Sequence, residues 1–221
     1  MPTALITGAS AGLGRALAAA LVRRKWTVIG TGRDAAALEA AAREAGFTAV
    51  PGDVTDPAHR AALARPALDL LVNNASSLGV SPRPPLARYP VADLEDVYRV
   101  NVFAPLALTQ LLLPALTASR GVVIDVSSDA AVEPYEGWGG YGSAKAALDQ
   151  LTAVLAVEHP DLSVYAIDPG DLRTAMHQRA FPGEDISDRP RPETAVPAFL
   201  RLLDERPPSG RYRAADLLVT A

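Results

Sequence analysis

The 221-residue chain contains no cysteine. Disulfide bonds, thiolate metal ligands and thiol nucleophiles are therefore excluded. Lysine is almost as scarce, because only Lys25 and Lys145 are lysine among the 21 basic residues and arginine supplies the rest. The net charge is only −4 and no stretch is strongly basic, which argues against nucleic acid or a membrane surface as the partner. We therefore expect a small-molecule substrate, and no metal site.

The beginning of the chain has no targeting segment that the sequence reveals. Its first apolar residues, 4–6, lead directly into Gly8, with no charged region before them and no cleavage site after them. The apolar tract at 106–116 is interrupted by polar residues, and we judge it too short to span a bilayer. These features predict a cytoplasmic protein. With 49% hydrophobic residues, residues 1–221 are expected to bury one core and to form a single domain.

Short apolar runs rich in β-branched residues alternate along the chain with Ala-, Leu- and Arg-rich segments that have helical spacing. This alternation predicts right-handed βαβ crossovers. The expected fold is α/β and doubly wound, with a parallel sheet of about 6–7 strands and helices on both faces. The expected strands are 4–7, 27–31, 48–50, 68–72, 122–126 and 164–167, and the expected helices are 15–24, 34–45, 57–65, 91–119, 143–158 and 193–204.

A glycine-rich turn, TGASAGLG, joins the first expected strand to the first expected helix. Glycine permits positive φ and close backbone approach, and the free N–H groups of the next helix attract a pyrophosphate. The alternative is a tight turn with no ligand. The spacing T-G-x-x-x-G-x-G also differs from the G-x-G-x-x-G fingerprint. The candidate phosphate-binding residues are Gly8, Ser10, Gly12, Leu13 and Gly14.

Tyr141 and Lys145 are four residues apart, which places them on one face of a helix. Tyrosine is a poor acid or base near neutral pH unless a nearby cation favours its phenolate, and a lysine can supply that cation. The alternative is an ordinary exposed lysine beside a packed tyrosine. Ser128 lies thirteen residues before Tyr141 at the end of an expected strand, with Ser127 as the second candidate, and Asn101 lies in the long helix expected before that strand.

These motifs together resemble those of the classical short-chain dehydrogenase/reductase family, over about residues 3–175. The resemblance implies a Rossmann fold and hydride transfer between a nicotinamide cofactor and a carbonyl or alcohol substrate. It implies that Tyr141 is the general acid or base and that Ser128 hydrogen-bonds the substrate oxygen. Lys145 would favour Tyr141 ionisation and bind ribose hydroxyls, and Asn101 would hold a water that links Lys145 to solvent.

The resemblance favours NADP(H) over NAD(H). NAD-dependent members often have Asp at the end of the second strand, where this chain has Gly32, and the guanidinium of the following Arg33 suits a 2′-phosphate. The alternatives are that Arg33 is a solvated loop cation and that Asp34 reads a bare ribose, although Asp34 more simply caps the next helix. The remaining expected cofactor contacts are Asp53, Val54, Asn74, Ala75, Tyr141, Lys145, Pro169, Gly170, Leu172 and Thr174.

Three stretches depart from the family pattern. Ser76 replaces a glycine, which would strain the backbone if that position needs positive φ. The segment 53–73 is short, which implies a clipped third helix, and the tail 210–221 lacks the usual family ending.

Residues 174–192 suit neither a packed helix nor a strand, and we expect them to form a mobile lid over the substrate. Trp138, Met176 and Phe181 are the candidate substrate contacts.

The resemblance also implies a homodimer or homotetramer formed through the two long helices. Two other functions stay open. An epimerase or dehydratase of the extended branch would need a large C-terminal domain, whereas 51 residues follow Gly170 (221 − 170). A non-catalytic NADP(H)-binding regulatory protein could dispense with Tyr141 and Lys145, which this chain keeps.

Overall fold

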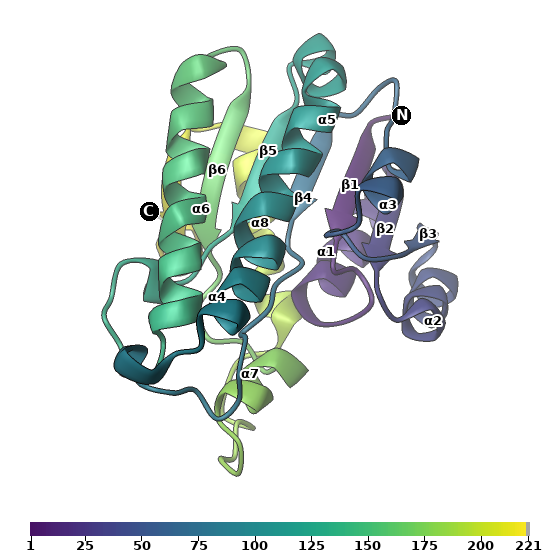
Figure 1. The fold of residues 1–221 in the computed structure, drawn as a ribbon. Coiled ribbons are helices and arrows are strands. Elements are labelled where there is room, and N and C mark those ends of the chain that lie inside the picture. Colours follow the sequence, from purple (N-terminus) through teal and green to yellow (C-terminus); the bar gives the residue numbers. More distant parts are fainter. Residues whose placement is uncertain (220–221) are drawn as a thin grey trace.

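Seven parallel strands form one sheet in the computed structural model, which describes residues 1–219. The strand order is β3-β2-β1-β4-β5-β6-β7, so the chain crosses from one half of the sheet to the other between β3 and β4 (Figure 1). Sheets of this kind bind ligands beyond the carboxyl ends of the strands at that reversal. The predicted doubly wound fold is therefore confirmed. The strands are β1 Thr3–Thr7, β2 Thr27–Gly32, β3 Thr48–Pro51, β4 Leu70–Asn73, β5 Val122–Val126, β6 Ser163–Asp168 and β7 Gly210–Arg213.

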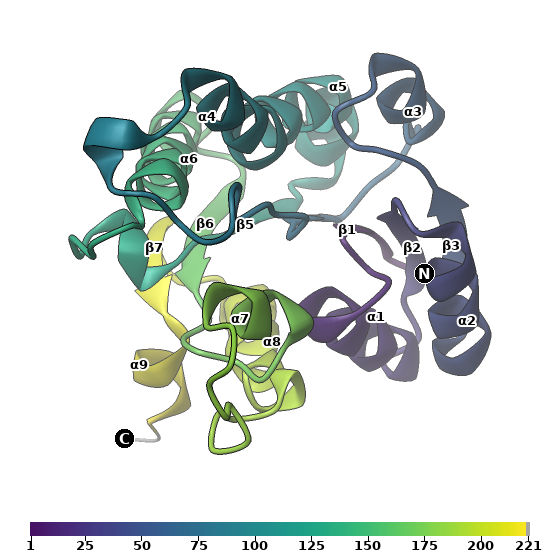
Figure 2. The ribbon, with the colours of Figure 1, turned by 60° about the horizontal axis from the view of Figure 1, so that its bottom comes forward.

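Helices cover both faces of the sheet (Figure 2). The pair α5 and α6 packs on one face, with α3 and α4 beside it, and α1, α2 and α8 pack on the other. The helices are α1 Gly12–Arg23, α2 Ala35–Ala45, α3 Pro57–Ala62, α4 Val91–Tyr98, α5 Ala104–Ser119, α6 Gly139–Glu158, α7 Ala175–Ala180, α8 Val196–Glu205 and α9 Ala214–Leu218.

The core consists of two large apolar layers, one on each face of the sheet. Neighbouring residues of a strand point to opposite faces, so Leu5 of β1 packs in the layer of Leu112 on α5, whereas Ile6 packs in the layer of Leu17 on α1. These four side chains are at most 2% exposed. Burying each one contributes about 1.5 to 3 kcal/mol, which holds the strand ends in a fixed position under the site.

The long helix expected at 91–119 is continuous but not uniform. A π-helical segment at Arg99–Phe103 separates α4 from α5. Pro105 follows it and has no N–H to donate to the carbonyl of Asn101, so the regular hydrogen-bond ladder is broken there. By length and composition alone, the 29 residues from 91 to 119 are apolar enough to cross a membrane, a test that the buried core helices of other proteins also pass. Its inner face packs in the core of the sheet.

Two parts of the C-terminal region were not expected. β7 pairs with β6 and completes the sheet, and α9 follows it, although the sequence analysis assigned neither element. Segment 174–192 was expected to be irregular, but it contains the six-residue helix α7. The clipped third helix is confirmed, because α3 has only six residues.

Candidate functional site

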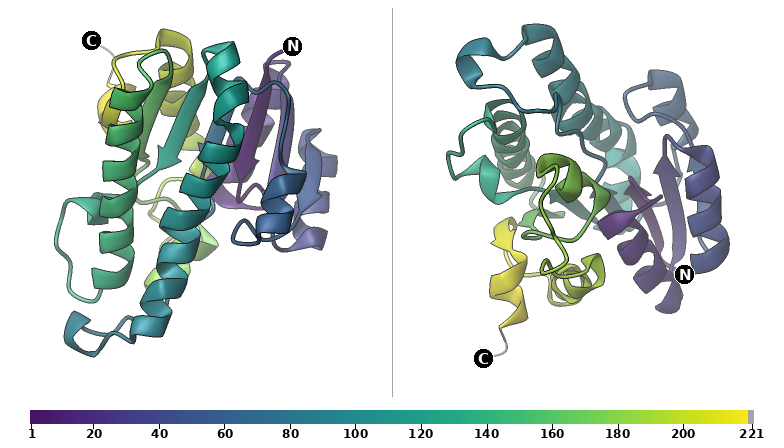
Figure 3. Two further views of the ribbon diagram at one scale, coloured as in Figure 1. Left: turned by 45° about the horizontal axis from the view of Figure 1, so that its top comes forward. Right: turned by 90° about the horizontal axis from the view of Figure 1, so that it is seen from below.

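The carboxyl ends of the central strands open onto a cavity of about 520 Å³, and α7 lies beyond them at the same end of the sheet (Figure 3). Most of the residues singled out from the sequence line this one cavity. Gly14, Asn101 and Phe181 do not. The predicted residues that do line it are Gly8, Ser10, Gly12, Leu13, Arg33, Asp53, Val54, Asn74, Ala75, Ser128, Trp138, Tyr141, Lys145, Pro169, Gly170, Leu172, Thr174 and Met176.

The glycine turn is shaped by close backbone contacts. Gly8 and Gly12 have φ of 68° and 54°, a region that glycine enters without strain. A Cβ added at Gly14 would lie 2.4 Å from the Gly8 carbonyl oxygen and 2.6 Å from Asn74 Nδ2. α1 begins at Gly12 and has no side-chain cap, so its first N–H groups are left for an anion.

Hydrogen bonds between β1 and the end of β4 hold this turn in place. The Thr7 hydroxyl accepts from the backbone N–H groups of Asn74 and Ala75, each at 2.9 Å. The Asn74 side chain donates back to the Thr7 carbonyl at 2.8 Å. The Asn74 amide therefore ties the two central strands together directly below the glycines.

The far end of the cavity carries Arg33 and Asp53. Asp34 caps α2 by accepting from the Ala37 N–H at 2.9 Å, so the capping interpretation of Asp34 is confirmed. Arg33 is exposed and forms no ion pair within residues 1–219, which leaves its guanidinium accessible to an anion. Partial burial acts to raise the pKa of Asp53, but hydrogen bonds from Thr55 and the charge of Arg33 outweigh it and lower that pKa. Asp53 is therefore an anionic acceptor at this end.

Tyr141 and Lys145 lie side by side near the N-terminus of α6, which begins at Gly139 rather than at the expected position 143. They are only 9% and 2% exposed. The Lys145 ammonium donates to the Val126 carbonyl at 2.7 Å and lies 5.6 Å from the centre of the Tyr141 ring. Burial lowers the pKa of Lys145 to about 8, while the carboxylates of Asp125 and Asp149 oppose this shift.

Burial also dominates at Tyr141. It raises the pKa of Tyr141 to about 12, with hydrogen-bonding contacts from the hydroxyls of Ser76 and Ser128 acting in the opposite direction. Desolvation of the phenolate is the largest cause of this shift, and the Lys145 ammonium, which is itself bonded to Val126, is not among the causes. Tyr141 is therefore protonated near neutral pH in this structure.

A second polar group is buried behind Lys145. Asp125 on β5 accepts from Asn73 Nδ2 and from the Thr152 hydroxyl, both at 2.7 Å. Burial raises the pKa of Asp125, and these two hydrogen bonds lower it. The network joins β4, β5 and α6, so it sets the depth at which α6 presents Lys145 to the cavity.

Asn101 is completely buried in the π-helical segment. Its Oδ1 accepts from the Ser76 hydroxyl and from the Ser77 N–H, each at 2.9 Å, and its Nδ2 donates to the Ser77 carbonyl at 2.8 Å. Ser76 does not have positive φ, so the strain considered for this replacement does not arise. Instead the Ser76 hydroxyl joins Asn101 to the cavity, which the sequence analysis missed.

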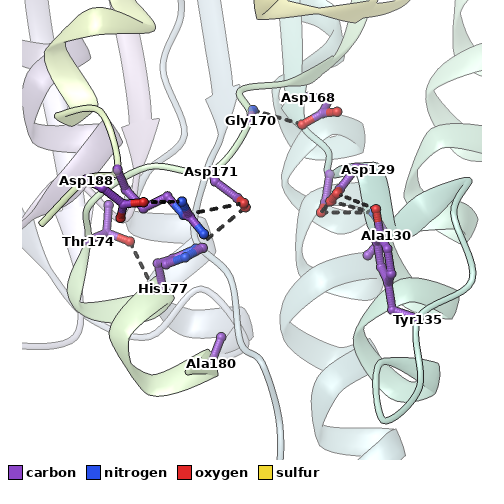
Figure 4. Close-up of polar contacts among 12 residues, drawn as sticks. Asp129, Ala130, Tyr135, Asp168, Gly170, Asp171, Thr174, His177, Ala180 and Asp188 are labelled. Carbon is purple, nitrogen blue, oxygen red and sulfur yellow. Dashed lines mark hydrogen bonds and ion pairs between the residues drawn. The ribbon is translucent and has the colours of Figure 1, made fainter. Parts of the chain in front are cut away.

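The substrate end of the cavity is bordered by two polar groups that face one another (Figure 4). On one side, Asp129 accepts from the hydroxyls of Ser128 and Tyr135, both at 2.9 Å. On the other, His177 Nδ1 lies 3.7 Å from Asp171. Asp129 and Asp171 were missed, although the position of Asp129 directly after Ser128 could have indicated it. Ser127 is buried, and its hydroxyl has no partner in the part of the chain that the structure describes.

Phe181, the third expected substrate contact, does not line the cavity. It packs against Trp138 and His177, with ring centres 5.9 and 4.8 Å away. Arg83 covers this aromatic group, with its guanidinium carbon 4.0 Å from the centre of the Trp138 ring and Nη1 donating to the Ala180 carbonyl at 2.5 Å. Phe181 therefore supports the wall of the cavity rather than lining it.

A doubly wound parallel sheet with a glycine turn at the reversal of strand order defines a Rossmann-type domain. The family model for short chain dehydrogenases matches residues 2–185. The chain belongs to this family of oxidoreductases.

Relatives and solved structures agree with this assignment. Serine 3-dehydrogenase of Agrobacterium fabrum is 39% identical over 183 residues, which cover 78% of this chain and 72% of that protein. YciK of Escherichia coli, an uncharacterized oxidoreductase, is 35% identical over 217 residues, which cover 91% and 85%. A short chain dehydrogenase from Shigella flexneri, solved with NADP, superposes with a TM-score of 0.88 at 32% identity and 97% coverage of both chains. One from Escherichia coli, solved with NADPH, has a TM-score of 0.85 at 33% identity and 96% coverage of both.

Proposed function

We propose that this protein is an NADP(H)-dependent oxidoreductase that moves a hydride between nicotinamide and a carbonyl or alcohol carbon. One observation carries the proposal: a single cavity joins the glycine turn and Arg33 to Ser128, Tyr141 and Lys145. The NADP and NADPH complexes of the Shigella flexneri and Escherichia coli dehydrogenases support the choice of cofactor.

The residues of the cavity fit a dinucleotide phosphate. The space around Gly14 admits no Cβ, as expected where backbone must approach a ligand closely. The uncapped start of α1 offers N–H donors for a pyrophosphate. Arg33 stands where a 2′-phosphate would need a cation, and the next residue, Asp34, is committed to capping α2. These groups would hold NADP(H), which supplies or accepts the hydride when it is bound.

Tyr141 is the proton donor in reduction. Its raised pKa keeps it protonated at neutral pH, so it gives its hydroxyl proton to the substrate oxygen as negative charge develops there. Ser128 borders the same part of the cavity and donates a hydrogen bond to that oxygen. Lys145 binds ribose hydroxyls through its ammonium, and Asn101 holds the water that returns a proton to this end of the site. In oxidation each proton moves in the opposite direction.

The experiment is an NADPH-oxidation screen with small ketones and aldehydes, followed by kinetics on any hit. Tyr141→Phe removes the acidic proton and little else, so kcat should fall by about 100-fold or more while NADPH binding is retained. Tyr98→Phe is the matched control, since Tyr98 packs against Phe103 away from the cavity and should leave kcat unchanged. More than a tenth of kcat remaining in Tyr141→Phe would contradict the mechanism.

The same measurements distinguish the other functions. NADPH binding without turnover of any substrate would favour the regulatory protein. An epimerase or dehydratase would return its cofactor unchanged, so consumption of a substrate with no net oxidation of NADPH would favour that function. We also propose a homodimer or homotetramer through α5 and α6, where Leu106, Leu111, Val154 and Val157 are exposed. Light scattering after size-exclusion chromatography tests this, and a monomeric mass would refute it.

A further inference from the structure

Arg211 on β7 makes polar contacts with three segments that surround the candidate site. Its Nε donates to the Asp149 carboxylate on α6 at 2.9 Å, and its Nη2 donates to the Ser128 carbonyl at 2.9 Å. The same Nη2 lies 3.8 Å from the carboxylate of Asp168, at the end of β6. The match to the family model ends at residue 185, so no family motif used above includes Arg211.

The direction of the Arg211 side chain follows from the strand that carries it. β7 lies beside β6 at one edge of the sheet (Figure 2). Tyr212 packs in the apolar layer of α1 and α8, and neighbouring residues of a strand point to opposite faces, so Arg211 points to the face that α6 covers. The side chains of Arg211 and Asp149 are only 27% and 14% exposed, so water and salt weaken this charge-assisted bond little.

Asp149 connects Arg211 to the residues that the proposed mechanism uses on α6. It lies four residues after Lys145 and eight residues after Tyr141, so the three side chains follow one another along one face of the helix. The two hydrogen bonds of Arg211 therefore join this face of α6 to the carbonyl of Ser128.

α6 has other attachments to the sheet besides Arg211. The Lys145 ammonium donates to the Val126 carbonyl, and the Thr152 hydroxyl donates to the Asp125 carboxylate, both at 2.7 Å. Both acceptors belong to β5. The position of α6 on the sheet therefore does not depend on Arg211.

The turn that follows β5 is held less firmly. The Ser127 N–H donates to the Ile167 carbonyl on β6 at 2.8 Å, which fixes the chain up to that point. The Ser128 carbonyl accepts from the Ala131 N–H at 3.1 Å within the turn, and in residues 1–219 its one partner from outside the turn is Arg211. Loss of Arg211 should therefore release the peptide after Ser128 and leave α6 in place.

We propose that Arg211 is a positioning residue, whose guanidinium fixes the Ser128 peptide against the face of α6 that carries Tyr141 and Lys145. This contact sets the distance between the hydroxyl that binds the substrate oxygen and the hydroxyl that protonates it. A misplacement of about 1 Å between such groups can cost about 100-fold in rate. Arg211 does not line the cavity, so it acts through Ser128 and touches neither substrate nor cofactor.

The inference rests on the proposed function, so the first of its two measurements needs no turnover. Hydrogen exchange followed by NMR in Arg211→Gln should show the Ala131 amide exchanging at least about tenfold faster than in the wild type, because the carbonyl that it binds has lost its outside partner. The amides of 143–158 should exchange as in the wild type.

The second measurement is kinetic, with a substrate found in the screen above. In Arg211→Gln, kcat should fall about 10- to 100-fold, and the Kd for NADPH should stay unchanged because α6 and the glycine turn keep their positions. Arg211→Lys keeps a charged donor and should recover part of both changes. It also supplies both measurements if Arg211→Gln does not fold.

Arg201→Gln is the matched control. Arg201 forms an ion pair with Glu205 and donates from Nη1 to the Leu217 carbonyl at 2.7 Å, so it also joins two elements, α8 and α9, but it does not line the cavity. Its loss should leave kcat and the exchange of the Ala131 amide unchanged.

Two results would overturn the proposal. One is wild-type exchange of the Ala131 amide in Arg211→Gln, whether or not a substrate has been found. The other is wild-type kcat in Arg211→Gln when Tyr141→Phe is inactive. Faster exchange at Ala131 together with a Tyr141→Phe variant that keeps its kcat would mean that the contact exists and that the proposed function fails instead.

Discussion

The charge of Lys145 gives the sharpest quantitative prediction. Lys145 is 2% exposed, and burial lowers its pKa to about 8. Because lysine is a base, its ammonium charge is present below that pKa and is lost as the pH rises through it. At pH 7 about 90% of the protein carries the charge, and at pH 9.5 only about 3% does, a ratio of about thirty.

NADPH affinity should follow this population, because only the ammonium can donate strongly to the ribose hydroxyls. Hydrogen bonds to a charged group contribute about 1.5 to 3 kcal/mol, which corresponds to about 10- to 150-fold in affinity. The loss in affinity cannot exceed either the roughly thirtyfold fall in the charged form of Lys145 or the contribution of its hydrogen bonds, so the smaller of these two factors limits it. We therefore expect the Kd for NADPH to rise about 10- to 30-fold between pH 7 and pH 9.5, measured by titration calorimetry at constant ionic strength.

Two variants isolate the effect. Lys145→Met should weaken binding at pH 7 by about the same factor and make the Kd independent of pH over this range. Lys25→Met is the control, since Lys25 is exposed in the turn after α1 and should preserve the wild-type profile. An NADPH affinity that is constant from pH 7 to 9.5, or a Lys145→Met variant that keeps the wild-type pH dependence, would refute the assignment of Lys145 to the ribose.

Three further predictions use other parts of the molecule. In the same calorimetry, Arg33→Ala should weaken NADPH binding about tenfold and leave NADH binding unchanged. Arg43→Ala on α2 is the control and should change neither affinity. Equal losses of affinity for both cofactors would show that Arg33 does not bind the 2′-phosphate. Burial lowers the pKa of His59 below its ordinary 6.5, so the neutral form stabilises the fold above that pH and this contribution is lost on acidification. Urea titrations at pH 7.5 and 5 should therefore show a smaller pH dependence in His59→Gln than in the wild type, and an identical one would contradict this. In hydrogen exchange, the amides of 175–190 should exchange faster than those of 143–158 without ligand and slow when NADPH and a substrate analogue bind; equal protection in the free protein would mean that no lid exists.

The sheet could be expected from the sequence because its signals are local. Most of the six expected strands are short apolar runs that are buried on both faces and so need no polar alternation, and segments with helical periodicity separate these runs. β7 was missed because its sequence, GRYR, has no such run and lies at the edge of the sheet, where only its pairing with β6 makes it a strand. The π-helical segment was missed for a related reason, since Pro105 indicated a disturbance in the ladder but not its form.

Some residues of the candidate site could likewise be found from local sequence signals, and others could not. The glycine turn, Tyr141 and Lys145 could be found because their spacing along one turn or one helix face is itself the signal. Ser76 could not be assigned, because its contact with Asn101 depends on how the loop after β4 meets the π-helical segment.

By itself, the sequence therefore determined the doubly wound fold and the residue types that gather at the carboxyl ends of its strands. Only the tertiary structure decided their chemical state, because that state depends on burial. Helical periodicity places Tyr141 beside Lys145, but the packing of α6 on the sheet removes water from both side chains. This desolvation, rather than the attraction between them, raises the pKa of Tyr141 and lowers that of Lys145.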